Sequence, residues 1–304
     1  MKNIELLSTR LNALGIPSKR EIRTAELSTL RIGGPSALTA FPETSDAITS
    51  AIRSARECGV DFLTVGNGSN ILFSDSGFHG LIIVTNKCKS FSVKENIISA
   101  DCGTSFTRLA STARDASLSG IEFAHGIPGT VGGAVCMNAG AYGCEVSDCL
   151  ISATVYNTDT DTVTEYSKDD CKLGYRTSVF ASNPNLTVLS ARFELTYGEK
   201  SAIHEKMSDN MKSRREKQPL EFPNAGSTFK RPEGLFAAKL IDDAGLKGFR
   251  IGGAEVSTKH AGFVINRENA TSDDVLRLID HIKNEVYQKF GVMLECEIKI
   301  IGTV

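Results

Sequence analysis

Two glycine-rich stretches hold the residues whose types and spacing could do chemistry. The longer one, residues 126–143, contains six glycines and reads GIPGTVGGAVCMNAGAYG. It has few side chains to bury, and each glycine costs backbone entropy on folding, so we expect it to pack no core. Small residues also leave peptide N–H groups open, and several of these together can bind phosphate oxygens. The stretch therefore predicts a bound nucleotide or dinucleotide.

The shorter stretch, Gly66–Asn70, follows a predicted strand and begins like the dinucleotide fingerprint G-x-G-x-x-G. Its sixth position is Ile71, and the residues after it favour a strand or loop, whereas the fingerprint requires a helix there. A P-loop is also excluded, because no G-x-x-x-x-G-K-[ST] run exists. Alone, this stretch would be a tight turn with Asn and Gly at positive φ. Two such loops in one chain favour a shared ligand.

Composition limits the class of protein. The chain has 304 residues, of which 41% are hydrophobic and 23% charged, as expected of a soluble globular protein with two or three domains. The net charge of −2 offers no basic field for nucleic acid. Apolar runs such as residues 81–84 are too short to span a membrane, and the first residues lack an apolar signal-peptide segment. We therefore expect a cytoplasmic chain with no nucleic-acid or membrane partner.

The eight cysteines contain no C-x-x-C pair and no metal-ligand spacing. We expect reduced thiols and no metal site.

Hydrophobic periodicity predicts the regular elements of an α+β fold. Helices are expected at residues 4–14, 45–58, 105–117, 202–217, 236–244 and 272–290. Thr104 should cap the third helix, and Thr271 with Asp274 has capping-box spacing. Strands are expected at residues 61–65, 81–84, 150–157, 162–166, 186–195 and 293–301. These elements suggest three successive domains, at residues 1–85, 86–198 and 199–304.

Several motifs in order along the chain resemble the UDP-N-acetylenolpyruvoylglucosamine reductases. Besides the two glycine stretches, they are Glu122–Phe123, Gly174–Ser178, Pro223–Lys230, Leu240–Asp242, Gly252–Ala254 and Leu294–Glu297. Each motif alone is weak, whereas the ordered set is specific and covers almost the whole chain. The sequence lacks the extra substrate loop of the longer subclass, so it resembles the shorter, second type.

The resemblance implies a fold and a reaction. The fold would be a two-lobed FAD-binding domain of the vanillyl-alcohol-oxidase type, followed by a C-terminal α+β substrate domain. NADPH would reduce non-covalently bound FAD, which would pass hydride to the enolpyruvyl group of UDP-N-acetylglucosamine-enolpyruvate. The product would be UDP-N-acetylmuramate, a peptidoglycan precursor, and we expect the enzyme to act as a monomer.

This reaction needs a group that stabilises enolate charge and an acid that protonates the adjacent carbon. By resemblance, Arg176 would serve the first need, because its guanidinium pairs with carboxylates, and Ser227 the second. Glu297 would be the third catalytic residue; the alternation of apolar and charged side chains along 294–300 supports its place on a strand that lines a cleft. The plain alternatives are a surface salt bridge for Arg176, a loop role for Ser227 and a solvated strand face for Glu297.

The resemblance also implies binding residues. The expected FAD-binding residues are Gly66, Asn67, Gly68, Ser69, Asn70, Gly126, Gly129, Thr130, Gly132, Gly133, Asn138, Ala139 and Gly140. The expected substrate-binding residues are Tyr175, Lys217, Asn224, Lys230 and Lys299. Lys299 replaces the Arg usual in the family, and for Arg214 and Arg215 substrate contact and helix-dipole complementation stay equally open. We expect His125 and Cys136 to lie near the flavin without a covalent bond to it.

Two other functions remain open at this point. One is an oxidase of the same superfamily that uses oxygen and an alcohol or sugar; the Ser227 motif and Leu294–Glu297 suit the reductase instead. The other is a flavin- or nucleotide-binding protein without catalysis, which would be favoured if Arg176, Ser227 and Glu297 did not share one cleft.

Overall fold

The computed structural model describes residues 2–302, which form two compact units. Each unit combines segments that are distant in the sequence. Unit 1 consists of Met1–Lys19, Leu38–Asn67 and Gly80–Arg214, and unit 2 of Arg20–Ala37, Gly68–His79 and Arg215–Val304. The three successive domains expected from the sequence, at residues 1–85, 86–198 and 199–304, stay a prediction. Within residues 2–302, every helix is too short or too polar to cross a membrane.

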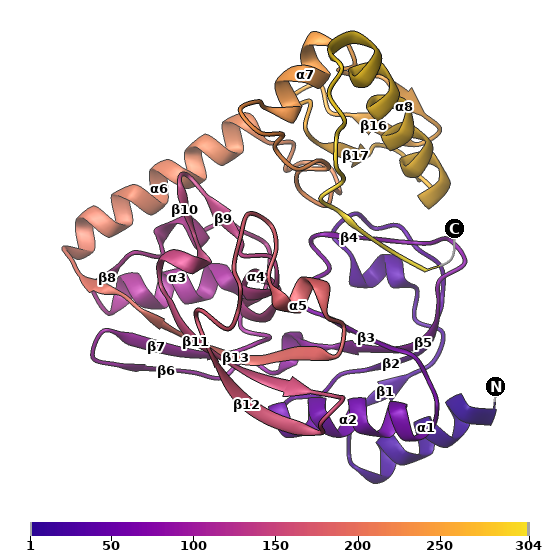
Figure 1. Ribbon diagram of the computed structural model, residues 1–304, viewed down its shortest axis with the longest axis vertical. Helices are drawn as coiled ribbons and strands as arrows, with labels where there is room; N and C mark the ends of the chain where they lie inside the picture. Colours follow the sequence, from indigo (N-terminus) through magenta and orange to yellow (C-terminus); the bar gives the residue numbers. More distant parts are fainter. Residues whose placement is uncertain (1, 303–304) are drawn as a thin grey trace. The chain divides into compact units, whose positions relative to one another are not determined.

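The first core of unit 1 lies where two helices meet a small sheet. Helices α1 (Lys2–Ala13) and α2 (Ser45–Glu57), both predicted from their apolar spacing, lie side by side (Figure 1). Their apolar stripes are fully buried at Leu7, Leu11 and Ile52. The sheet has the order β1–β2–β5–β3, with β1 at Ser18–Lys19, β2 at Ser36–Ala40, β5 at Phe78–Val84 and β3 at Phe62–Val65.

The second core of unit 1 is built on a five-stranded antiparallel sheet in the order β12–β11–β13–β7–β6. Its strands are β6 (Phe91–Lys94), β7 (Ile97–Asp101), β11 (Leu150–Asn157), β12 (Thr162–Ser167) and β13 (Leu186–Glu194). The last three were predicted, whereas β6 and β7 were missed. Phe106 and Phe123 fill this core with an edge-to-face contact at 5.9 Å between ring centroids.

Shorter elements complete this part of unit 1. They are α3 (Phe106–Asp115), α4 (Val131–Cys136), α5 (Val179–Ser182), β8 (Leu118–Ser119), β9 (Gly140–Ala141), β10 (Cys144–Glu145), β14 (Thr196–Tyr197), and the 3-10 helices η2 (Thr85–Lys87), η3 (Glu122–Ala124) and η4 (Val146–Asp148). The predicted cap of α3 was wrong by one residue: Ser105, not Thr104, accepts the hydrogen bond from the Arg108 N–H.

Helix α4 corrects the expectation that the long glycine stretch packs no core. Val131, Ala134 and Val135 are buried against the second core. A Cβ atom on Gly132 would lie 2.9 Å from the Cβ of Cys102, so the missing side chain lets the helix approach β7 and its following turn closely. Small residues at helical spacing therefore pack here by bringing backbone against backbone.

Helix α6 (Lys200–Lys217) buries Ile203 and Met207, as its weak apolar stripe predicted. Near its start, the Lys206 ammonium pairs at 3.1 Å with the buried carboxylate of Glu122. This ion pair helps hold the helix on unit 1.

Unit 2 packs two helices on a small antiparallel sheet. Its elements are η1 (Thr24–Leu27), β4 (Ile71–Phe73), α7 (Ala237–Asp243), β15 (Arg250–Ile251), β16 (Ala254–Val256), β17 (Val264–Asn266), α8 (Ser272–Phe290) and β18 (Lys299–Ile301). Helix α8 has the predicted bounds, with the Thr271–Asp274 capping box formed and Gly291 as its C-cap at φ +68°.

The predicted terminal strand was too long. Only Lys299–Ile301 forms β18, which pairs in parallel with β4, while Cys296 makes an isolated bridge to Phe229. The alternation is kept at Leu294 and Ile298, which are buried, but Ile300 is 42% exposed. The C-terminal segment therefore pairs with two different neighbours, Phe229 and β4, and not with one long strand.

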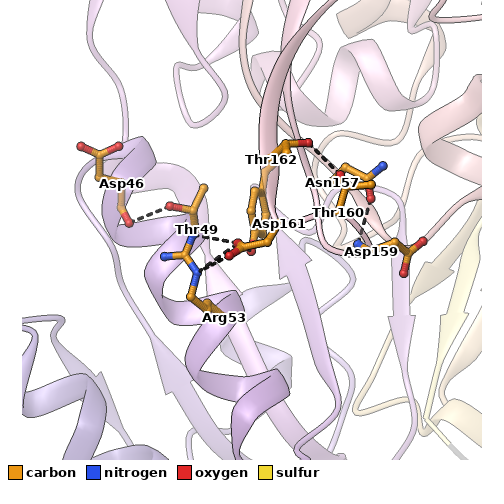
Figure 2. A network of polar contacts seen from close by, with 9 residues as sticks. Asp46, Thr49, Arg53, Asn157, Asp159, Thr160, Asp161 and Thr162 are labelled. Atoms are coloured by element: carbon orange, nitrogen blue, oxygen red, sulfur yellow. Dashed lines mark hydrogen bonds and ion pairs between the residues drawn. The ribbon is translucent and has the colours of Figure 1, made fainter.

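A polar network joins α2 to the turn between β11 and β12 (Figure 2). The Arg53 guanidinium donates to both carboxylate oxygens of Asp161 at 2.7–3.1 Å, and the buried Tyr156 hydroxyl donates to the same carboxylate at 2.7 Å. These hydrogen bonds, that from Arg53 first, lower the pKa of Asp161. Burial, together with this carboxylate, raises the pKa of Tyr156 to about 12.

We expect Asp161→Asn to lower the free energy of unfolding at pH 7. Because the folded state depresses the Asp161 pKa, the carboxylate stabilises the fold above its unfolded pKa of about 4, and this contribution is lost as pH falls further. Urea midpoints of the two proteins should therefore converge below about pH 4. Asp159→Asn, in the same turn but outside the Arg53 contact, is the control. An Asp161→Asn difference that stays constant with pH would contradict the electrostatic link.

Candidate active site

The two glycine stretches meet within unit 1. The Asn67 side-chain amide donates to the Pro128 carbonyl at 2.8 Å. A Cβ atom on Gly66 would lie 2.3 Å from Thr130 Oγ1, so only glycine allows this approach. A ligand shared by the two loops, as predicted from sequence, requires such a contact.

Thr130 carries a buried hydroxyl that the protein leaves unsatisfied. The residue is 1% exposed, and within residues 2–302 its Oγ1 has no hydrogen-bond partner. A buried polar group without a partner costs about 1–3 kcal/mol. The atom lies beside Gly66 and 3.7 Å from where a Gly133 Cβ would stand. The loops thus fit a ligand that brings polar atoms, as the expected dinucleotide does.

A cationic hollow of about 410 Å³ opens beside Asn67. Its lining includes Lys87, Lys89, Ser105 and Arg108. Cationic side chains next to the glycine loop suit phosphate oxygens. Sequence reasoning missed these residues; the only signal was the pair of lysines flanking Cys88, and their approach to Arg108 depends on the fold.

The other half of the shorter stretch lies in unit 2, beside the C-terminal segment. A Cβ atom on Gly68 would lie 1.9 Å from the Leu27 carbonyl oxygen. The Asn70 amide donates to the Glu297 carbonyl at 3.2 Å, and the Lys299 N–H donates to the Asn70 carbonyl at 3.0 Å. Asn70, predicted to bind FAD, therefore adjoins Glu297 and Lys299, which were predicted to act on substrate.

Arg176 lies at the corner of a tight turn in unit 1. Gly174 and Thr177 exchange backbone hydrogen bonds at 3.1 and 3.2 Å across this turn. Arg176 itself adopts φ +52°, a left-handed conformation that is costly for a residue with a Cβ and that clusters at functional sites. Its guanidinium donates to the Gly140 carbonyl at 2.9 Å and lies 5.2 Å from the centre of the half-exposed Tyr175 ring.

Ser227 and Glu297 are brought together within unit 2. The Glu297 N–H donates to the carbonyl of Thr228, which follows Ser227, at 2.8 Å. One residue further, Phe229 and Cys296 form an antiparallel bridge. Ser227 is half-buried and follows Gly226, which is at φ +78°. Seventy residues of chain separate these two predicted catalytic residues, and the backbone pairing removes that separation.

The predicted substrate residues differ in whether their side chains already contact other protein groups. The Asn224 amide donates to Phe222 O at 2.8 Å and accepts the Gly226 N–H at 3.0 Å, which shapes the loop before Ser227. Lys230 forms an ion pair with Glu295. Lys217, at the end of α6, and Lys299 are exposed.

One cation lies beside the start of the long glycine stretch. A Cβ atom on Gly126 would stand 3.4 Å from Arg214 Cδ, and burial lowers the pKa of Arg214. The position agrees with either role that the sequence left open.

Two family models match the chain. The model described as FAD binding domain matches residues 36–165, and the model described as UDP-N-acetylenolpyruvoylglucosamine reductase, C-terminal domain, matches residues 218–301. The first range contains both glycine stretches, and the second contains Ser227 and Glu297.

Relatives of known name resemble the chain over nearly its whole length. The UDP-N-acetylenolpyruvoylglucosamine reductase of Clostridium novyi is 44% identical over 93% of this chain and 92% of its own. That of Exiguobacterium sibiricum is 47% identical over 90% and 89%. Among solved structures, the UDP-N-acetylenolpyruvylglucosamine reductase of Thermus caldophilus superposes with a TM-score of 0.81 at 31% identity, covering 94% of this chain and all of that one.

A more distant structure shows the fold alone. The Acremonium strictum glucooligosaccharide oxidase is 15% identical, with a TM-score of 0.51 over 92% of this chain and 58% of its own. The match agrees with the expected two-lobed α+β fold of the vanillyl-alcohol-oxidase type. With relatives more than 40% identical over at least 89% of both chains, the protein belongs to the UDP-N-acetylenolpyruvoylglucosamine reductase family.

Proposed function

We propose that the chain is an FAD-dependent reductase that converts UDP-N-acetylglucosamine-enolpyruvate to UDP-N-acetylmuramate, with NADPH as the reductant. The observation that carries the proposal is the backbone pairing of the Ser227 and Glu297 segments, inside the range that matches the reductase C-terminal model. This observation favours the reductase over an oxidase of the same fold, for which these two segments have no stated role.

FAD, when bound, supplies hydride transfer between NADPH and the enolpyruvyl group. Gly66, Asn67 and Thr130 would hold it, since their loops meet and leave one buried hydroxyl unsatisfied. Lys87 and Arg108, in the hollow beside Asn67, would supply positive charge to its diphosphate. Gly133 would let FAD approach the backbone beside the Thr130 hydroxyl, because a Cβ atom there would meet only that hydroxyl, at 3.7 Å.

Arg176 would stabilise the enolate that forms as hydride reaches the terminal carbon. Its guanidinium stays charged at any working pH and matches a carboxylate with two parallel hydrogen bonds. Two backbone carbonyls already orient it, so little reorganisation is needed as negative charge develops.

Ser227 would donate the proton to the carbon adjacent to the carboxylate. A serine hydroxyl is a weak acid, so the role requires a preorganised site. The pairing of Thr228 with Glu297 supplies such order in the backbone beside the hydroxyl. We assign Glu297 to the same site, as the family resemblance implies.

The substrate's diphosphate and sugar would be bound by Tyr175, Lys217, Asn224, Lys230 and Lys299. Lys230 would then exchange its ion pair with Glu295 for a substrate oxygen. We further propose that the enzyme works as a cytoplasmic monomer without a nucleic-acid partner.

The test is the anaerobic visible spectrum of the purified protein. We expect NADPH to bleach the flavin absorbance and the enolpyruvyl nucleotide to restore it without oxygen. Oxygen added alone to the reduced protein is the comparison that identifies an oxidase. Restoration by oxygen, together with no response to the nucleotide, would overturn the proposed function.

We expect Ser227→Ala to leave flavin reduction by NADPH within about twofold of wild type, and to slow reoxidation by the enolpyruvyl nucleotide by about 100-fold or more, because general acid catalysis contributes about 10²–10⁴-fold. Stopped-flow absorbance measures both half-reactions in one preparation, so the first serves as the control for the second. Wild-type rates in both half-reactions would remove Ser227 from the chemistry.

A further inference from the structure

Asn138 has a fully buried side chain whose nitrogen and oxygen both hydrogen-bond to the protein. Its amide nitrogen donates to the Gly174 carbonyl at 3.1 Å, and its side-chain oxygen accepts the Ser147 N–H at 2.9 Å. It is 0% exposed and adopts φ +42°, a conformation that Asn tolerates better than most residues. The sequence predicted Asn138 to bind FAD, but its amide already bonds the protein on both sides.

The carbonyl of the same residue contacts the predicted catalytic arginine. Arg176 Nη1 donates to Asn138 O at 3.4 Å, while Nη2 donates to Gly140 O at 2.9 Å. Asn138 therefore holds Gly174, at the start of the Arg176 turn, by its side chain, and the tip of Arg176 by its backbone. Two residues past Arg176, the Ser178 hydroxyl donates to Cys136 O at 2.6 Å.

These contacts connect two short segments, residues 136–140 and 174–178. Arg176 lies in the turn of the second segment at a strained φ that surrounding contacts must maintain. Of those contacts, the Asn138–Gly174 bond is the one made by a buried side chain inside the glycine stretch. Loss of this bond frees the first residue of the turn while leaving Arg176 itself unchanged.

We propose that Asn138 is the positioning residue for Arg176 rather than a ligand of FAD. The proposal rests on the proposed function, because it assigns to Asn138 an effect on the half-reaction in which Arg176 acts. Its amide fixes the carbonyl of Gly174 and thereby the direction in which the arginine leaves the turn. The long glycine stretch then serves both halves of the site: its start adjoins the Gly66 loop, and its end holds the arginine.

Asn138→Asp tests this with one atom changed. The variant keeps the acceptor for Ser147 N–H, but it replaces the bond to the turn by repulsion between a buried carboxylate oxygen and the Gly174 carbonyl. We expect reoxidation by the enolpyruvyl nucleotide to slow by about 10- to 100-fold, since misplacement of about 1 Å can cost that much. Flavin reduction by NADPH should stay within about twofold and FAD content unchanged, if the cofactor site is intact.

Asn266→Asp is the matched control. Asn266 is also buried, and its amide likewise bridges a backbone carbonyl, Leu30 O at 3.1 Å, and a backbone N–H, that of Ala270 at 2.9 Å. The two variants make the same chemical change, but only one touches the Arg176 turn. A half-reaction imbalance in Asn138→Asp that Asn266→Asp lacks therefore reports positioning rather than general loosening.

A double-mutant cycle identifies the residue through which Asn138 acts. In an Arg176→Ala background, Asn138→Asp should slow reoxidation no further, since neighbours that act as one unit are not additive. Full additivity would overturn the proposal. If Asn138→Asp does not fold, Asn138→Gly removes the same amide without a left-handed penalty and takes its place.

Other outcomes overturn the positioning role in distinct ways. Loss of FAD from Asn138→Asp would restore the cofactor-ligand prediction, and wild-type rates in both half-reactions would leave Asn138 without a role. A fall of both rates and of Tm that matches whatever Asn266→Asp shows would make the residue structural only. Failure of the wild-type protein to be reoxidised by the nucleotide would instead overturn the proposed function.

Discussion

Close approach of neighbouring segments to the glycine backbone is the constraint on which unit 1 depends. Four places in the long glycine stretch use the absence or small size of a side chain: Gly126 faces α6, Thr130 faces Gly66, Gly132 faces Cys102, and Gly140 faces the β10 strand. A Cβ atom at Gly132 or Gly140 would come within 3 Å of Cys102 or of β10, so it would push these neighbouring segments away from the stretch. The long glycine stretch therefore packs against neighbouring segments in addition to its predicted role in ligand binding. Its central helix, α4, is part of the second core.

In unit 2, backbone pairing rather than small residues brings distant segments of the chain together. The residues after Ser227 pair with Cys296 and Glu297, and the carbonyl of Thr228 accepts the Glu297 N–H. Thr228 itself is fully buried, and its hydroxyl accepts the Val264 N–H at 2.9 Å. The two predicted catalytic residues of this unit are therefore placed by hydrogen bonds that no side chain of the site supplies.

Periodicity predicted the long elements well because their own sequence contains the information. Helix α8 has an apolar stripe, a capping box and a terminal glycine, and all three agree with its bounds. The failures fall where a neighbour decides. Helix α4 forms because Cys102 and the second core cover its small residues, and β18 stops short because its upstream residues pair with Phe229 rather than with β4.

The sequence by itself determined the family and the residue types of the reaction, because ordered motifs survive as short local patterns whatever their contacts. The sequence could not determine which polar atoms already have hydrogen-bond or ion-pair partners within the protein. The Asn138 side-chain amide, which the sequence made a candidate FAD ligand, hydrogen-bonds to Gly174 and Ser147 instead. The Lys230 ammonium forms an ion pair with Glu295. The Thr130 hydroxyl is left without a hydrogen-bond partner among the residues that the structure describes. Hydrogen-bond partners far apart in sequence meet only after folding, so the tertiary structure alone decides which groups remain for a ligand.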